Sequence, residues 1–208
     1  MSPSGRVLTA VAATLLLIAL SPLLVVSSLA IAIDSSGGVL FRQVRVGKGG
    51  VPFVLYKFRT MRRDADPRGP SPVRGDDPRV TRIGRVLRRL GLDELPQLLN
   101  VVVGDMALVG PRPQLAEELR DYVGDQRDLL TMRASVRPGM TSPWCVSPEG
   151  HKNRPSVEML HSDCAYVGSR SVARDAAILL ATVRYVLRRT WQPRPRVESP
   201  RLDRGGSQ

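Results

Sequence analysis

The distribution of apolar residues divides the chain into one long apolar segment and a series of shorter patterned segments. Residues 7–33 contain 27 residues without a charged side chain, interrupted near the middle by Ser21-Pro22. A straight helix of this length measures about 40 Å, more than the roughly 30 Å hydrocarbon core of a bilayer. Pro22 has no N–H and leaves the carbonyl of Ile18 without its helical partner. We therefore predict a sharp bend at Ser21-Pro22, with two arms that are each too short to cross a bilayer.

Three arrangements fit this apolar segment: a kinked transmembrane helix, a cleaved signal peptide, and a re-entrant hairpin that enters and leaves one leaflet. A signal peptide would use Arg6 as its basic region and Ala30-Ile31-Ala32 as its cleavage site, but the apolar run is longer than the usual core of such a peptide. Hydropathy does not separate a spanning helix from a re-entrant one. The residues alone leave the choice open.

The following segments show strand-like and then helix-like periodicity. Residues 39–61 alternate in polarity around a Lys-Gly-Gly turn, which predicts a β-hairpin with Lys57 and Arg59 on one face. Apolar residues recur at helical spacing in 80–90 and again in 172–189, with arginines on the remaining faces. Amphipathic helices of this kind lie on membrane surfaces. The expected fold is α+β and mainly helical.

Segments rich in proline, glycine and charge separate these patterns. The composition of residues 63–79 predicts a mobile loop. Residues 114–131 are expected to form an acid-rich helical region with a solvated face. A chain of 208 residues is long enough for one domain plus an anchor. We therefore divide it into a membrane anchor at 1–33, an interfacial domain at 34–190 and a disordered basic tail at 191–208.

The charge balance predicts anionic partners. Lys and Arg number 31 against 19 Asp and Glu, a net charge of +12. Such a chain suits an anionic membrane surface, phosphorylated substrates or nucleic acid. Aromatic residues make up only 4% and do not alternate with basic ones, which argues against nucleic acid. Cys145 and Cys164 show no metal-type spacing to the two histidines.

The candidate chemistry is concentrated between Arg85 and Pro113. Proline is tolerated only in the first turn of a helix, so Pro96 predicts a helix that starts near Asp93. The neighbouring carboxylates of Asp93 and Glu94 would point about 100° apart on a helix and converge only on a shared ligand. A divalent metal bound to a diphosphate would be such a ligand. The alternative is purely structural, with Asp93 as the helix cap and Glu94 as a partner of the helix dipole.

Several longer motifs resemble one known family. LDELPQLLNVVVGDMALVGPRP (92–113) is similar to the signature of the bacterial sugar transferases that are monotopic polyprenyl-phosphate phosphoglycosyl transferases. Segments 34–61, 77–89 and 136–141 are also similar to that family, and the resemblance covers about residues 7 to 188. The family pattern continues in the tail at Asp163, Tyr166, Ser171, Asp175, Leu179 and Thr182.

The resemblance implies a substrate pair, a site and a location. The chain would transfer a sugar 1-phosphate from a nucleotide-diphosphate sugar, expected to be a UDP-sugar, to polyprenyl (undecaprenyl) phosphate. This step would begin the synthesis of a surface glycan or exopolysaccharide. The N-terminal segment would be a re-entrant anchor broken at Ser21 and Pro22, with the catalytic domain on the cytoplasmic face of the inner membrane. No nucleic acid partner is expected.

The resemblance also assigns roles to individual residues. Asp93 would be the nucleophile that forms an aspartyl-phosphosugar, and Glu94 would help it hold Mg²⁺ or place the donor. The expected phosphate-binding residues are Lys57, Arg59, Arg85 and Arg112, with Asp163 in a supporting role.

The sequence departs from the family pattern mainly at 142–155. Ser142, Pro143 and Cys145 stand where Gly, Leu and Gln are usual, which leaves the sugar undefined and is compatible with reduced activity. A second hypothesis is a non-enzymatic basic membrane protein that binds anionic lipid or nucleic acid. Only the acid pair Asp93-Glu94 and Arg112 discriminate between the two, because such a binder has no use for acids among its arginines.

Overall fold

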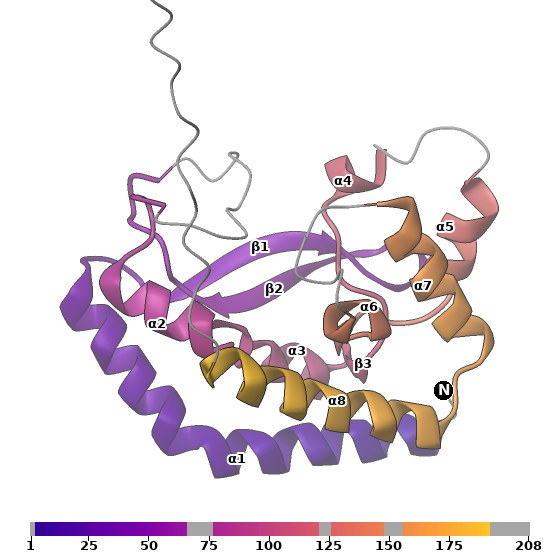
Figure 1. The fold of residues 1–208 in the computed structure, drawn as a ribbon, viewed down its shortest axis with the longest axis horizontal. Coiled ribbons are helices and arrows are strands. Elements are labelled where there is room, and N and C mark those ends of the chain that lie inside the picture. The colour runs from indigo at the N-terminus through magenta and orange to yellow at the C-terminus, as the bar shows by residue number, and fades with distance from the viewer. Residues whose placement is uncertain (1–2, 66–76, 121–125, 148–155, 192–208) are drawn as a thin grey trace, which may run out of the picture.

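The chain folds into a mainly helical body with two small sheets. The computed structural model describes residues 3–65, 77–120, 126–147 and 156–191. In Figure 1 the long helix α1 follows the lower and left edges of the molecule, and the β-hairpin crosses its middle. This agrees with the predicted α+β, mainly helical class. The predicted basic tail and most of the predicted loop lie outside the described residues.

Helix α1 (Pro3–Asp34) is one element with Pro22 inside it, and Figure 1 shows the predicted bend about midway. The carbonyl of Ile18, which Pro22 deprives of a backbone donor, accepts a hydrogen bond of 2.7 Å from Ser21 Oγ. The Ser-Pro pair therefore bends the helix and also satisfies the exposed carbonyl. By length and composition, Gly5–Asp34 is able to cross a membrane.

The predicted hairpin is present as β1 (Leu40–Val46) and β2 (Pro52–Phe58), which pair antiparallel. The turn between them is the short helix η1 (Lys48–Gly50). Gly49 and Gly50 have φ of 67° and 80°, a region that glycine adopts without strain. The register places Phe41 opposite Lys57.

Helix α2 (Arg82–Leu90) corresponds to the helix predicted at 80–90. Thr81 accepts a hydrogen bond from the amide of Gly84, and Asp34 at the end of α1 accepts one from the amide of Ile83 at 3.0 Å. The helix ends at Gly91, which has φ of 70°. These caps fix α2 against the C-terminal arm of α1.

The acid pair follows Gly91 and lies outside any α-helix. Leu92–Glu94 forms a single 3₁₀ turn, η2, and helix α3 (Gln97–Val103) begins after Pro96. The predicted helix start near Asp93 is therefore wrong by about one turn, because the left-handed Gly91 first directs the chain into a tight turn. Asp93 does not cap α3, whose cap residue is Pro96.

The remaining elements complete the body. Strand β3 (Ala107–Val109) pairs parallel to β4 (Gly139–Thr141), a pairing that the periodicity did not predict. The predicted helical region 114–131 contains α4 (Ala116–Arg120) and the first part of α5 (Arg127–Ala134). Three further helices follow: α6 (Pro143–Val146), α7 (Val157–Gly168) and α8 (Val172–Trp191).

Both arms of α1 pack against this body. In the N-terminal arm, the buried Ala13 belongs to a core cluster with Leu98 and Val101 of α3. In the C-terminal arm, Ile31 belongs to a second cluster with Phe58 of β2 and Leu87 of α2. The bend thus allows one helix to cover two parts of the same domain.

Candidate functional site

The site forms where β2, η2 and the turn after β3 meet. Leu55 and Lys57 are two residues apart on β2 and share one face, because side chains alternate along a strand. Leu55 is 2% exposed and belongs to the core, whereas the Nζ of Lys57 reaches Glu94 Oε1 at 2.7 Å. This ion pair connects the hairpin to the acid turn.

Asp93 lies beside this ion pair. Within the described residues its carboxylate makes no ion pair. Burial raises the pKa of Asp93, and the negative charge of Glu94 raises it further, while the charges of Lys57 and Arg88 oppose the rise. The arrangement therefore holds a half-buried carboxylate close to cations, an environment found at many functional sites.

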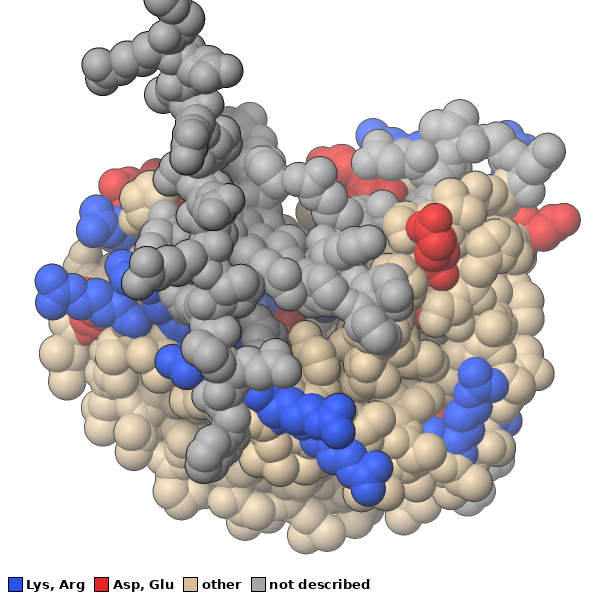
Figure 2. Space-filling view, in the orientation of Figure 1, with Lys and Arg blue, Asp and Glu red and all other residues tan. Residues whose placement is uncertain are grey.

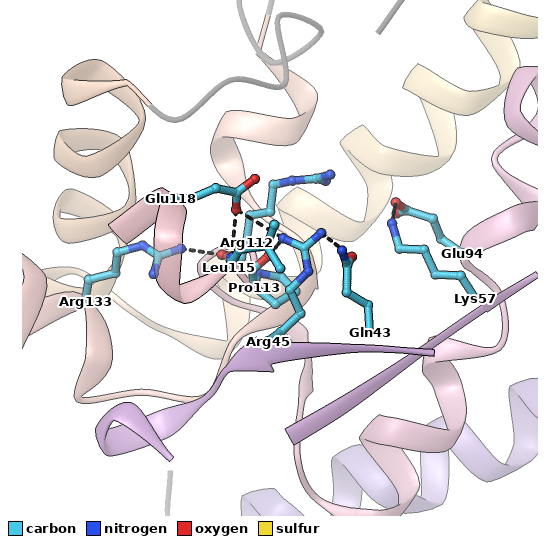
Figure 3. A network of polar contacts seen from close by, with 9 residues as sticks. All are labelled: Gln43, Arg45, Lys57, Glu94, Arg112, Pro113, Leu115, Glu118 and Arg133. Carbon is cyan, nitrogen blue, oxygen red and sulfur yellow. Dashed lines mark hydrogen bonds and ion pairs between the residues drawn. The ribbon is translucent and has the colours of Figure 1, made fainter. Parts of the chain in front are cut away.

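Arg112 enters the site from the Gly-Pro-Arg-Pro turn that follows β3. Figure 3 shows its guanidinium directed toward the Lys57–Glu94 pair. Burial alone would lower the pKa of Arg112, but Glu94, Cys145 and Glu118 outweigh that effect and raise it. Arg112 therefore stays cationic, as a phosphate-binding residue must.

The backbone of this turn is held from behind by buried polar groups. Arg133 of α5 donates from Nη2 to the carbonyl oxygen of Arg112 and from Nε to Asp163 Oδ2 at 2.9 Å. Asp163 is fully buried in α7, and burial raises the pKa of its carboxyl while Arg133 opposes the rise. Tyr166, three residues along α7, donates to the carbonyl of Val109 at 3.2 Å. The predicted supporting residue Asp163 thus acts on the turn through Arg133.

A second arginine lines the same pocket. Arg45 of β1 pairs with Glu118 of α4 at 3.1 Å and donates to Gln43 at 2.7 Å (Figure 3). The amide of Leu115 also donates to Glu118, at 2.7 Å. The small pocket between these elements is lined by, among others, Arg45, Lys57, Glu94, Gln97, Arg112 and Met140.

Two predicted phosphate-binding residues are not brought into this cluster. Arg59 donates to the carbonyls of Ser35 and Ser36 at 2.6 and 2.7 Å, so its guanidinium connects the end of β2 to the end of α1. Arg85 is exposed on the outer side of α2. The structure therefore gives Arg59 a bracing contact and places Arg85 at the surface.

The arginine of α2 that faces the acid pair is Arg88, which the sequence reasoning missed. Its Nε donates to Thr60 Oγ1 at 2.8 Å, and its charge acts on Asp93. Gly84 marks the same face of α2, since a Cβ there would lie 2.2 Å from the carbonyl oxygen of Thr60. Arg88 is four residues after Gly84 and so lies on that face. This spacing is the sequence signal that could have identified it.

The unusual residues at 142–145 border Arg112. Ser142 caps α6 by accepting a hydrogen bond from the amide of Cys145 at 3.2 Å, and its hydroxyl donates to Cys145 Sγ at 3.3 Å. The thiol of Cys145 in turn interacts with the Arg112 side chain. The departure from the family pattern therefore falls at the site itself. Residues 148–155 of the same segment lie outside the described residues.

Comparison with known proteins places the chain among bacterial sugar transferases. The family described as bacterial sugar transferase matches residues 3–189. A UDP-glucose:undecaprenyl-phosphate glucose-1-phosphate transferase of Caulobacter vibrioides is 45% identical over 184 residues, which cover 86% of this chain and 67% of that protein.

Two further relatives extend the comparison. A UDP-N-acetylgalactosamine-undecaprenyl-phosphate N-acetylgalactosaminephosphotransferase of Aeromonas hydrophila is 38% identical, over 80% of this chain and 40% of its own length. The exopolysaccharide production protein PSS of Rhizobium leguminosarum bv. phaseoli is 41% identical, over 80% of this chain and 86% of its own length. The chain thus belongs to the bacterial sugar transferase family, whose members are enzymes of the transferase class.

Proposed function

We propose that this protein transfers a sugar 1-phosphate from a UDP-sugar to undecaprenyl phosphate and so begins the synthesis of a surface glycan. The observation that carries the proposal is the juxtaposition of Asp93 and Glu94 with the cations Lys57, Arg88 and Arg112. Relatives named for UDP-sugars and undecaprenyl phosphate support the same substrates. They give no support to the alternative of a non-enzymatic basic membrane protein.

The reaction would proceed in two displacements at one phosphorus atom. A carboxylate oxygen of Asp93 forms a bond to the phosphorus that carries the sugar, and the bond to the bridging oxygen breaks and releases UMP. An oxygen of undecaprenyl phosphate then attacks the same phosphorus and displaces Asp93. A covalent step of this kind divides one difficult transfer into two easier ones. Glu94 is the weaker candidate for the nucleophile, because it is held in an ion pair by Lys57.

The residues present fit a bound Mg²⁺. Asp93 and Glu94 are adjacent, and their mutual repulsion contributes to the raised pKa of Asp93. No cluster of three or more His, Cys, Asp or Glu side chains occurs among the described residues. Magnesium, however, is usually held by one or two carboxylates together with substrate phosphates. When bound, it would reduce the negative charge of the diphosphate, while Lys57 and Arg112 bind and orient the phosphate oxygens.

The protein would work at the cytoplasmic face of the inner membrane, with α1 embedded in one leaflet. Helices α1 and α8 both lie along the lower edge in Figure 1, and Figure 2 shows an uncharged surface over that edge, with Lys and Arg side chains above it. Exposed apolar side chains of α3 and α8 add to the outer surface: Leu99, Val103, Leu180, Val183 and Leu187. A surface of this kind suits an interfacial enzyme with a lipid substrate.

The proposal is tested by supplying donor without lipid acceptor. Purified protein incubated with Mg²⁺ and UDP-glucose or UDP-N-acetylgalactosamine should release about one equivalent of UMP. The Asp93 peptide should then carry a hydroxylamine-sensitive label from the sugar phosphate. Asp93→Asn should abolish both signals, because a neutral amide does not attack phosphorus.

The matched control is Asp128→Asn, which removes an exposed acid on α5 and should retain both signals. If labelling of the protein and release of UMP both occur only when the lipid acceptor is present, the transfer is direct and takes place in a ternary complex. Asp93 would then be a metal ligand.

A further inference from the structure

Gln97 is a buried polar residue that the mechanism above does not use. It is the first residue of α3, only 2% exposed, and it lines the pocket together with Lys57, Glu94 and Arg112. Among the described residues no hydrogen bond joins its carboxamide to another group, and its polar atoms are not fully enclosed, so they retain solvent access. Buried polar side chains are normally hydrogen-bonded, so an unpartnered amide beside a pocket indicates a ligand contact.

The fold itself does not require this amide. Asn100, one turn further along α3, is also fully buried, but it donates to the carbonyl of Val54 at 2.7 Å and accepts from the amide of Tyr56 at 3.1 Å. Asn100 therefore connects α3 to the hairpin. Gln97 lies on the same helix and makes no such connection among the described residues.

The chemistry of the amide restricts its partner. Phosphate oxygens in this pocket are matched by the cations Lys57, Arg45 and Arg112. A neutral carboxamide, which both donates and accepts, matches a neutral hydroxyl better than it matches an anion. Gln97 lines the pocket together with Glu94, the neighbour of Asp93, so it lies near the phosphorus that Asp93 would attack. The neutral groups closest to that phosphorus belong to the sugar.

We propose that Gln97 hydrogen-bonds a hydroxyl group on the donor's sugar ring and thereby contributes to sugar selection. The proposal rests on the function proposed above. It extends that function by assigning one residue to the sugar, in addition to the residues that bind phosphate. Sites that pair a buried polar group with a substrate hydroxyl reject analogues that lack the hydroxyl.

The test combines a protein change with a substrate change. Gln97→Met keeps the approximate length of the side chain and removes its hydrogen-bonding groups. UMP release would be measured for the UDP-sugar that the unsubstituted protein turns over fastest, among UDP-glucose, UDP-galactose and their N-acetyl counterparts. Donors lacking one ring hydroxyl at a time would follow.

For one ring position, loss of the hydroxyl should lower kcat/KM about 10- to 100-fold in the unsubstituted protein, because one buried hydrogen bond is left unmade. In Gln97→Met, removal of the same hydroxyl should lower kcat/KM almost no further, because the hydrogen bond to it is already absent. The same substitution at Gln126, which does not line the pocket, should leave the full hydroxyl effect in place. Gln97→Met should also unfold at an unchanged or higher temperature, whereas a structural role would lower it.

Gln97→Asn provides a second variant, which keeps the amide but shortens its reach and should show the same loss of discrimination. The proposal is overturned if the loss of kcat/KM from the Gln97 substitution and the loss from the missing hydroxyl multiply at every ring position, in both variants. Absence of turnover with every donor in the unsubstituted protein would reject the proposed function, and this inference with it. Normal turnover together with multiplicative losses would reject the inference alone.

Discussion

At the scale of single residues, the ionised carboxylate of Asp93 lowers the stability of the folded protein. The raised pKa of Asp93, caused first by burial and then by Glu94, means that the folded state binds a proton more tightly than the unfolded state. The free energy of unfolding therefore falls as pH rises from the unfolded pKa, about 3.8, through the folded pKa. The penalty is present once Asp93 is ionised in the folded state. Residues whose charge is unfavourable for folding are characteristic of functional sites.

Asp93→Asn should accordingly make an inactive but more stable protein. We expect the unfolding temperature near pH 7 to rise by about 2–4 °C, which corresponds to about 1 kcal/mol in a chain of this size. The difference should shrink as pH falls through the folded pKa of Asp93 toward its unfolded value of 3.8. Thermal unfolding in detergent at several pH values measures both effects. Asp128→Asn is the control, and a lower unfolding temperature for Asp93→Asn would show that the carboxylate stabilises the fold.

A substitution at Arg112 distinguishes a phosphate contact that depends on the shape of the guanidinium from one that depends only on its charge. Pro111 and Pro113 restrict the turn, and a guanidinium binds phosphate through two parallel hydrogen bonds, whereas lysine offers a point charge. Arg112→Lys should lower kcat/KM by about 100-fold and leave membrane association unchanged. The exposed Arg120 of α4 provides the matched Arg→Lys control. Near-normal turnover in the Arg112 variant would exclude a bidentate phosphate contact.

At the scale of elements, α7 positions the turn that carries Arg112. Asp163 and Tyr166 lie on one face of this helix and reach two different carbonyls, one through Arg133 and one directly. The single hydroxyl hydrogen of Tyr166 is shared with Asp175 Oδ1, which lies 2.6 Å from the hydroxyl oxygen and connects α7 to α8. The turn is thus fixed through its backbone, and its side chains remain available to the pocket.

Asp163→Asn should damage both stability and catalysis. It leaves the guanidinium of Arg133, which is 7% exposed, without its counter-charge. Removal of one partner from a buried pair costs about 3–5 kcal/mol. Tyr166→Phe, which removes only a hydroxyl, should cost about 1–2 kcal/mol. Chemical unfolding of both variants measures the two losses of stability. Turnover is compared at denaturant concentrations below both unfolding transitions. Equal stability of Asp163→Asn and the unsubstituted protein would contradict the prediction.

The sequence predicted the elements whose pattern is local. The hairpin follows from alternation around two glycines, and α2 and α8 follow from apolar spacing. The parallel pairing of β3 with β4 was missed, since it depends on Gly110 and Gly139: a Cβ on Gly139 would lie 2.0 Å from the amide nitrogen of Gly110. Contacts between residues far apart in sequence leave no periodic signal.

The site shows the same limit. Lys57, Glu94 and Arg112 were predicted and lie together, because the resemblance covers all three motifs. Arg88 was missed in favour of Arg85, since helical spacing alone does not say which arginine faces inward. Cys145, a departure from the family pattern, lies close enough to Arg112 to influence its pKa, and only the three-dimensional structure brings these two residues near each other.

At the scale of the whole molecule, the two arms of α1 would determine how the domain meets the membrane in the proposed arrangement. Ala13 before the bend and Ile31 after it are both buried against the same body. A helix that spans the bilayer in a straight line would separate at least one arm from its partners. Packing of both arms against one body supports the re-entrant arrangement proposed above, because a straight spanning helix would lose the van der Waals contacts of one arm.

Labelling should place both ends of the chain on one side of the membrane. Single cysteines added before residue 3 and within 192–208, in a background where Cys145 and Cys164 are serine, should both react only with a reagent that reaches the cytoplasm. The double variant Ser21→Ala/Pro22→Ala should move a fraction of the N-terminus to the periplasm, because a straight helix regains its backbone hydrogen bond at Ile18 and no longer needs the serine hydroxyl. Thr14→Ala removes a similar side-chain hydrogen bond, to Ala10, away from the bend and should leave the topology unchanged. Periplasmic labelling of the N-terminus in the otherwise unsubstituted α1 would establish a spanning helix, and the contacts of one arm would then have to break in the membrane.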